Sequence, residues 1–74
     1  MQITVKLFAH FRNNRFNKEV RTIAPDTTVG AIVAELAIAE DEVGVVLING
    51  RHGSLDQPLA EGDNLSLFPL VGGG

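Results

Sequence analysis

The C-terminus carries the residues with the clearest chemical potential. The chain ends in three consecutive glycines, Gly72, Gly73 and Gly74. A run of glycines has the highest conformational freedom of any peptide and adds nothing to a folded core. It is also the narrowest peptide that a partner's active site could enclose. The whole segment from Leu70 to Gly74 spans up to about 17 Å when extended. We therefore expect the Gly74 carboxylate to be the reactive group; the alternative is a frayed terminus.

Other groups that could do chemistry are few. The chain has no cysteine, and its serines, Ser54 and Ser66, lie in no GxSxG setting. His10 and His52 are far apart in the sequence and have no third nitrogen or sulfur ligand, so a metal site would have to recruit carboxylates. We interpret both as partly exposed histidines at strand ends. The chain therefore has no evident catalytic apparatus of its own.

Length and charge indicate a single small domain and disfavour nucleic-acid and membrane binding. The 74 residues suffice for one small domain without cysteine cross-links, and enough of them are apolar for a core to form. The net charge of −3 disfavours binding to the phosphate backbone of nucleic acids. No apolar run approaches the roughly 20 residues of a membrane span, and the start resembles no signal peptide. We expect a cytoplasmic protein that binds neither nucleic acid nor membrane.

Alternating residues predict strands at both ends of the chain. Residues 2–9 place their aliphatic side chains on one face, and residues 65–68 repeat the pattern up to Pro69. Phe8 and Phe68 fall on the opposite face of their strands. If the two strands are neighbours, both phenylalanines form one exposed apolar patch beside the tail; alternatively, one of them caps the edge of the core under a loop.

The segment between these strands begins with a second predicted strand. Residues 16–23 follow a turn and place Phe16 and Val20 on the same side. The alternation slips at Ile23, before Pro25. This slip indicates either a bulge or the end of the strand.

A single helix follows. Thr27 or Thr28 can cap its first turn, and apolar residues then recur at helical spacing from Val29 to Leu36, which predicts about ten helical residues. Acidic residues 40–42 predict a loop or one helical turn. They form either a solvated surface or a docking surface for a basic partner.

The remaining segment has the signals of a hairpin. Residues 45–48 are apolar enough for a buried strand, and Asn49-Gly50 predicts a tight turn into a short strand from Arg51. Leu55 and Leu59 are expected to fill the core from the loop that follows.

Several short motifs in this order resemble the ubiquitin-like sulfur carriers, the family of the molybdopterin synthase small subunit and the thiamine-pathway sulfur carrier. They are Val5-Lys6-Leu7-Phe8-Ala9, Thr28-Val29-Gly30, Ile48-Asn49-Gly50-Arg51, Leu59 with Glu61-Gly62-Asp63, and Phe68-Pro69 followed by the glycines. The resemblance implies an α+β, β-grasp fold, in which a mixed sheet of four to five strands wraps around one helix. Residues 1–71 would form this single domain, and residues 72–74 a flexible tail.

The resemblance also implies a function. An adenylating enzyme of the ubiquitin-activating kind would use ATP to activate the Gly74 carboxylate, and a sulfur donor protein would then convert it to a thiocarboxylate. The chain itself would bind no cofactor and would act as a subunit or substrate of partner enzymes. The reactive residues would be Gly74 and Gly73, and the residues that contact partners would be Phe8, Leu59, Phe68, Leu70, Val71 and Gly72.

The resemblance leaves the accepting partner open. The first strand through Arg12, together with Phe68-Pro69, is similar to the molybdopterin type, for which the partner is the molybdopterin synthase large subunit. Val71 and the three glycines are closer to thiamine carriers, for which it is a thiazole synthase. We favour molybdopterin synthesis because more of the chain supports it. Further alternatives are a protein modifier, whose activated Gly74 forms amides with lysines, and a binding module with an idle tail.

Overall fold

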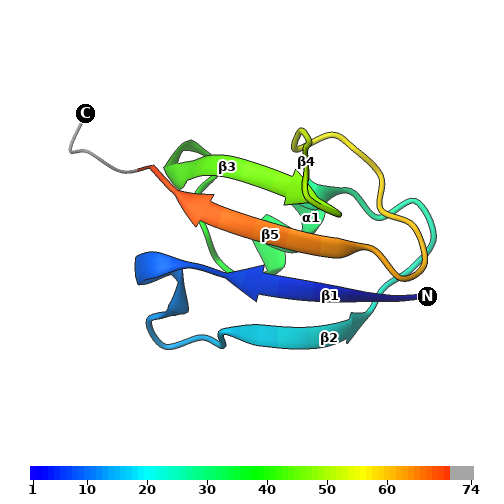
Figure 1. Cartoon of the computed structure of the whole chain (residues 1–74), viewed down its shortest axis with the longest axis horizontal. Coiled ribbons are helices and arrows are strands. Elements are labelled where there is room, and N and C mark those ends of the chain that lie inside the picture. The colour runs from blue at the N-terminus through cyan, green and yellow to red at the C-terminus, as the bar shows by residue number, and fades with distance from the viewer. Residues whose placement is uncertain (71–74) are drawn as a thin grey trace.

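The first and last strands predicted from the sequence are neighbours inside one sheet. In the computed structural model, which describes residues 1–70, five strands lie in the order β2-β1-β5-β3-β4 (Figure 1). β1 and β5 are parallel, with Val5 opposite Leu65, whereas the other neighbouring strands are antiparallel. The elements are β1 (Gln2–Leu7), the 3-10 turn η1 (Ala9–Arg12), β2 (Lys18–Thr22), α1 (Val29–Glu35), the 3-10 turn η2 (Glu40–Glu42), β3 (Val43–Ile48), β4 (Arg51–His52) and β5 (Asn64–Pro69).

One helix covers one face of this mixed sheet, which confirms the α+β, β-grasp prediction. Figure 1 looks onto the uncovered face, here called the open face, and α1 lies behind the sheet. Strand residues of one parity meet the helix in the core, as the alternation predicts. The buried apolar side chains are Ile3, Val5, Leu7, Phe11, Ile23, Val29, Ile32, Val33, Ile38, Val46, Ile48, Leu59, Leu65 and Leu67.

Helix α1 is shorter than its apolar spacing predicts. Thr28 caps its first turn, because the hydroxyl oxygen accepts a hydrogen bond from the Ala31 N–H at 3.2 Å. The helix then ends after seven residues, because Ala37 adopts a left-handed conformation with φ 59°. This reversal brings Ile38 into the core. In the described part of the chain, no helix is long and apolar enough to cross a bilayer.

The second strand begins later than predicted. β2 starts at Lys18, so Phe16 precedes it and packs against the core. Val20, in contrast, is 59% exposed, and its partner Thr4 on β1 belongs to the open face. The prediction that Phe16 and Val20 lie on the same side is therefore wrong. β2 ends at Thr22, which is the second of the two alternatives, and its register with β1 has no bulge. Ile23 keeps the parity of Glu19 and Arg21: it is buried, and its N–H donates to the carbonyl of Met1 at 2.7 Å.

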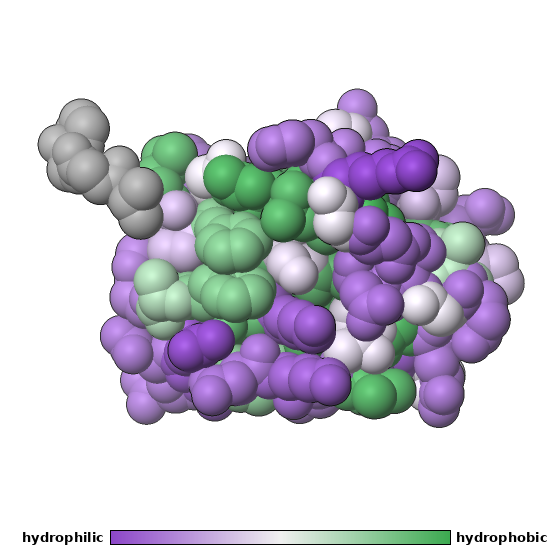
Figure 2. All heavy atoms as spheres, viewed as in Figure 1, coloured by the Kyte–Doolittle hydropathy of each residue, from purple (hydrophilic) through white to green (hydrophobic). Residues whose placement is uncertain are grey.

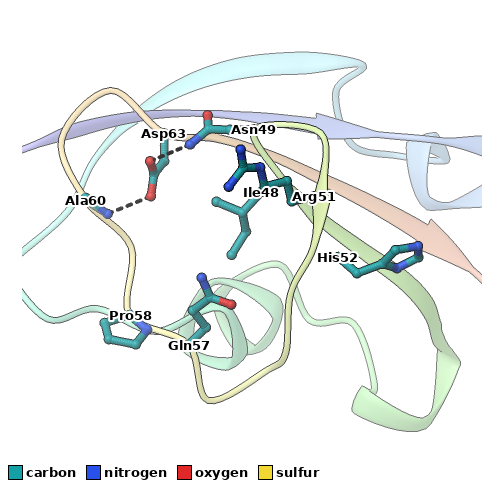
Figure 3. Close-up of a pocket in the computed structure, with 8 residues that line it drawn as sticks. All are labelled: Ile48, Asn49, Arg51, His52, Gln57, Pro58, Ala60 and Asp63. Carbon is teal, nitrogen blue, oxygen red and sulfur yellow. Dashed lines mark hydrogen bonds between the residues drawn. The ribbon is translucent and has the colours of Figure 1, made fainter.

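The Asn49-Gly50 turn is tied to the turn that precedes β5. The Asn49 side-chain amide donates to the Asp63 carboxylate at 2.9 Å, and the N–H of Ala60 donates to the other oxygen of that carboxylate at 2.8 Å (Figure 3). These residues line part of an open cavity of about 520 Å³ between the hairpin and the loop after it. Gly50 has φ 81°, as the tight turn requires. The hairpin motif thus has a structural role in fixing β3 against β5.

Candidate functional site

The candidate site is built around two stacked aromatic rings on the open face. The parallel pairing continues past β1, because the N–H of Phe8 donates to the carbonyl of Leu67 at 3.2 Å. Phe8 therefore lies beside Phe68, with ring centroids 4.2 Å apart and planes 10° from parallel. Both side chains are half-buried. The prediction that they form one apolar patch is confirmed, and neither ring belongs to the buried core.

The patch extends from the aromatic pair across β3. Val45 and Leu47 have the parity opposite to the buried residues of that strand. Together with His52 of β4 and the Phe68 ring they line a shallow, largely apolar pocket of about 350 Å³. Figure 2 shows hydrophobic side chains gathered on this face, over β3 and the end of β5. We call Phe8, Val45, Leu47, His52 and Phe68 the aromatic patch.

A positive charge is fixed at the edge of this patch. The guanidinium of Arg12 lies 5.3 Å from the centroid of the Phe8 ring, within cation–π range. Its Nε donates to the carbonyl of Leu7 at 2.7 Å, which holds the side chain in place. The chain can reach this position because η1 turns back directly after Phe8, starting at Ala9 with φ 52°. A partner surface that matches the patch is therefore apolar with an acidic group facing Arg12.

The end of β5 is held where the chain leaves the sheet. The Leu70 N–H donates to the carbonyl of Glu42 at 2.9 Å, while the Leu70 side chain is 62% exposed. Gly44 of β3 lies beside this point, and a Cβ there would approach the carbonyl oxygen of Pro69 to 2.8 Å. This contact needs glycine because no side chain fits against the opposing backbone. Leu70, where the described part of the chain ends, is therefore held at a fixed point next to the aromatic patch.

Of the residues expected to contact partners, the structure places three at the aromatic patch and one in the core. Phe8, Phe68 and Leu70 lie on or beside the aromatic patch. Leu59 is only 4% exposed and belongs to the core, so its expected place on the partner surface is wrong. The chain turns inward there because the N–H of Leu59 donates to the carbonyl of Thr27 at 2.8 Å. This agrees with the expectation, drawn from the loop pattern, that Leu59 fills the core.

The other predicted residues of the tail, namely Val71, Gly72, Gly73 and Gly74, lie outside the described residues. Within residues 1–70, no three His, Asp or Glu side chains come together as a metal site. His10 is exposed in η1 and His52 is exposed in β4. Val45 and Leu47 were not predicted to belong to the site, although their alternation with Val46 and Ile48 places them on the open face.

Comparisons with known proteins agree with this fold. The sequence matches the model of the ThiS family over residues 5–74. A Pyrococcus furiosus structure assigned as molybdopterin converting factor subunit 1 is 26% identical, with a TM-score of 0.77 and coverage of 96% of this chain and 99% of that chain. The Haloferax volcanii small archaeal modifier protein 1 is also 26% identical, with a TM-score of 0.75 and coverage of 95% and 98%.

A complex of subunits 1 and 2 of molybdopterin-converting factor from Helicobacter pylori matches at 22% identity, a TM-score of 0.65 and full coverage of both chains (100% each), and this likeness concerns the fold alone. A search of curated protein sequences gave no significant match. Since the family match runs over nearly the whole chain and the fold is that of these structures, this chain belongs to the ThiS family.

Proposed function

We propose that this protein is a sulfur carrier for molybdopterin synthesis, and that its Gly74 carboxylate carries the sulfur as a thiocarboxylate. The observation that carries the proposal is the family match, which includes the terminal glycines. The fixed end of β5 supports it, because Leu70 leads into those glycines directly beside an exposed aromatic patch. In this proposal, the aromatic patch binds the partner enzyme and the Gly74 carboxylate reacts.

The proposed chemistry requires activation because a carboxylate is a poor electrophile. A carboxylate oxygen of Gly74 attacks the α-phosphorus of ATP, and pyrophosphate leaves. A sulfide supplied by a donor protein then attacks the carbonyl carbon of the acyl adenylate, and the bond to AMP breaks. The product is a thiocarboxylate, whose sulfur is nucleophilic. The chain contributes the reacting carbonyl, whereas the adenylating enzyme contributes the nucleotide site.

The aromatic patch is the proposed docking surface for both kinds of partner. Burial of the Phe8 and Phe68 rings would remove apolar surface from water, and such aromatic side chains are common anchors of interfaces. A carboxylate of the partner facing Arg12 would fix the orientation of the chain, because charged groups near an interface set specificity and association rate. Docking in this orientation aims the glycines at the partner's active site.

Molybdopterin synthesis is the favoured pathway because of the 26% identical Pyrococcus furiosus structure, which is assigned as molybdopterin converting factor subunit 1. The accepting partner would be the synthase large subunit, as in the Helicobacter pylori complex of subunits 1 and 2. Family membership keeps a thiazole synthase of the thiamine pathway as the alternative acceptor.

A second candidate function is protein modification, and one observation favours it. The Haloferax volcanii small archaeal modifier protein 1 is as similar to this chain as the Pyrococcus furiosus structure is. Modification uses the same activated Gly74 carbonyl, but a lysine amine of another protein attacks it and an amide forms. The two functions therefore differ only in the nucleophile.

Intact mass spectrometry of the protein isolated from its own cells distinguishes these functions. Exchange of one terminal oxygen for sulfur is the expected result. Covalent adducts with lysines of other proteins would instead support modification, and an unchanged terminus under conditions of molybdopterin synthesis would contradict both. One residue added after Gly74 is the matched control, because it should abolish either product without affecting the fold.

Binding measurements with the purified large subunit test the docking surface. Phe8→Ala is expected to weaken binding more than it lowers the stability of the fold. Thr4→Ala, on the same face but outside the aromatic patch, is the control and should bind normally. Equal binding by both variants would remove the aromatic patch from the proposal.

A further inference from the structure

β2 is an edge of the sheet with unpaired backbone groups. Its only neighbour among the described residues is β1, as Figure 1 shows. Edge strands are templates for the addition of another strand, and proteins often block them with charged side chains. β2 differs from a simply blocked edge because Val20, at its centre, is 59% exposed.

The hydrogen bonds at both ends of the β1–β2 pair define which backbone groups are free. The Leu7 N–H donates to the carbonyl of Asn17 at 2.9 Å, and the Ile23 N–H donates to the carbonyl of Met1 at 2.7 Å. In an antiparallel pair, every second residue directs both its N–H and its C=O to the neighbouring strand. The bonds of Asn17 and Ile23 to β1 thus show which residues between them direct their backbone groups towards β1 and which direct them away from it.

Glu19 and Arg21 therefore direct their backbone groups to β1, where they pair with Val5 and Ile3. The N–H and C=O groups of the other three residues of β2, Lys18, Val20 and Thr22, point to the free edge. These backbone groups form hydrogen bonds with a second strand only if every second residue of that strand directs its own N–H and C=O groups towards them.

A second copy of β2 meets this requirement. When two copies run antiparallel with Val20 opposite Val20, Lys18 lies opposite Thr22 of the other copy, and all three free residues exchange hydrogen bonds. Glu19 then lies opposite Arg21 in both halves of the pair. These are non-hydrogen-bonded positions, where side chains approach most closely and opposite charges stabilise the pairing.

Other registers lack this complementarity. A four-residue shift, which places Lys18 at the centre, brings Glu19 opposite Asn17 of the other copy and removes the pairing with Arg21. Centring on Glu19 or on Arg21 places like charges opposite each other, which is destabilising. The order Lys-Glu-Val-Arg-Thr thus favours one register.

We propose that β2 is a self-association strand, through which a second copy of this chain extends the sheet in antiparallel register centred on Val20. The interface is isologous, since each copy contributes the same five residues. It is short and therefore belongs to the weak, transient class of interfaces. The two-fold axis is perpendicular to the sheet, so both open faces lie on the same side.

This arrangement leaves the proposed docking surface free. The aromatic patch is centred on β5 and β3, on the other side of β1 from the new interface. A dimer would present two such patches on one face, while both helices lie on the other. Self-association is thus compatible with binding to a partner enzyme, and it does not depend on the proposed function.

Sedimentation equilibrium up to about 1 mM protein tests the proposal, since this range covers weak dimers. The average mass is expected to rise towards that of a dimer. Hydrogen exchange tests the register: the amides of Lys18, Val20 and Thr22 should gain protection with concentration, whereas those of Glu19 and Arg21 should be protected at every concentration. A mass that remains monomeric, which would leave the edge to strands of other proteins, overturns the proposal.

Val20→Pro is the sharpest variant because the register places the lost N–H at the free edge, where it makes no bond to β1. It should fold and remain monomeric, and Val20→Lys should give the same result through charge repulsion at the two-fold axis. Self-association of either variant at the wild-type level would refute the predicted centre.

A charge-swap series tests the Glu19–Arg21 pairs. Arg21 also forms ion pairs within its own chain, with Glu19 at 2.8 Å and Glu35 at 3.1 Å, so the series uses a Glu35→Gln background. Glu19→Arg or Arg21→Glu alone should weaken self-association by about tenfold or more, because symmetry creates two like-charge pairs. The double variant should restore it. No recovery in the double variant would contradict the antiparallel register.

Discussion

The stacked pair on the open face allows a quantitative test of how the two ends of the chain cooperate. Phe8 and Phe68 are remote in sequence and meet only because β1 and β5 pair in parallel. Replacing either ring by alanine removes the stack, and aromatic pairs of this kind are worth about 0.5–1.5 kcal/mol beyond buried area. Phe8→Ala additionally removes the contact with Arg12, worth about 0.5–1 kcal/mol at an exposed site.

The total expected loss follows from the burial of the ring. Full burial of a phenylalanine contributes about 1.5–3 kcal/mol, and Phe8 is only half-buried, so burial adds about 1 kcal/mol. Phe8→Ala should therefore lower the free energy of unfolding by about 2–3.5 kcal/mol. Leu67→Ala, in the core beside it, should reach the upper part of the 2–5 kcal/mol range of such truncations.

Urea denaturation of the two single variants and the double variant gives the coupling free energy between the rings. We expect about 0.5–1.5 kcal/mol, since each single variant already removes the whole stack. A coupling below about 0.3 kcal/mol, within the error of additivity, would refute a stabilising stack. A loss for Phe8→Ala equal to that for Leu67→Ala would instead place Phe8 in the core.

Further substitutions test other contacts. Thr28→Ala should cost about 1 kcal/mol of unfolding free energy through loss of the helix cap, and an unchanged denaturation midpoint would argue against the cap. Arg15→Lys should cost about 1–2 kcal/mol, because a lysine cannot bond all three carbonyls that the guanidinium now reaches; full stability would show that one bond suffices. Gly44→Ala should cost about 1–3 kcal/mol and shift the NMR signals of the adjoining β5 end, since its Cβ would meet the Pro69 carbonyl; an unshifted spectrum would contradict this close approach. Gly73→Leu should leave the melting temperature unchanged and prevent adenylation, whereas a shift of several degrees would indicate that the tail is not free.

Local sequence patterns predicted much of the fold because they depend on short-range periodicity. The alternation around Val5 placed β1, Thr28 marked the start of the helix, and Asn49-Gly50 located the hairpin. The 3-10 turn η1 was not predicted, although Phe11 in it is buried. A single apolar residue between polar ones carries no periodic signal, so its burial depends on contacts that are remote in sequence.

The candidate site could be predicted only in part for the same reason. The parity of Phe8 and Phe68 indicated outward-facing rings, but the patch required the two strands to be neighbours. The resemblance suggested a partner contact for Leu59, whereas the backbone bond to Thr27 turns that residue into the core. Motif similarity orders residues along the chain and carries no information about which face they occupy.

For this protein, the sequence by itself determined the order of its strands and its helix, the family likeness and the expectation of a reactive glycine terminus, because these follow from residue types and local spacing. Only the tertiary structure decided that β1 and β5 lie in parallel, that Phe8 stacks on Phe68, and that β2 is an edge. Those features depend on which distant strands exchange hydrogen bonds. That choice minimises the free energy of the whole chain and cannot be read from any short segment.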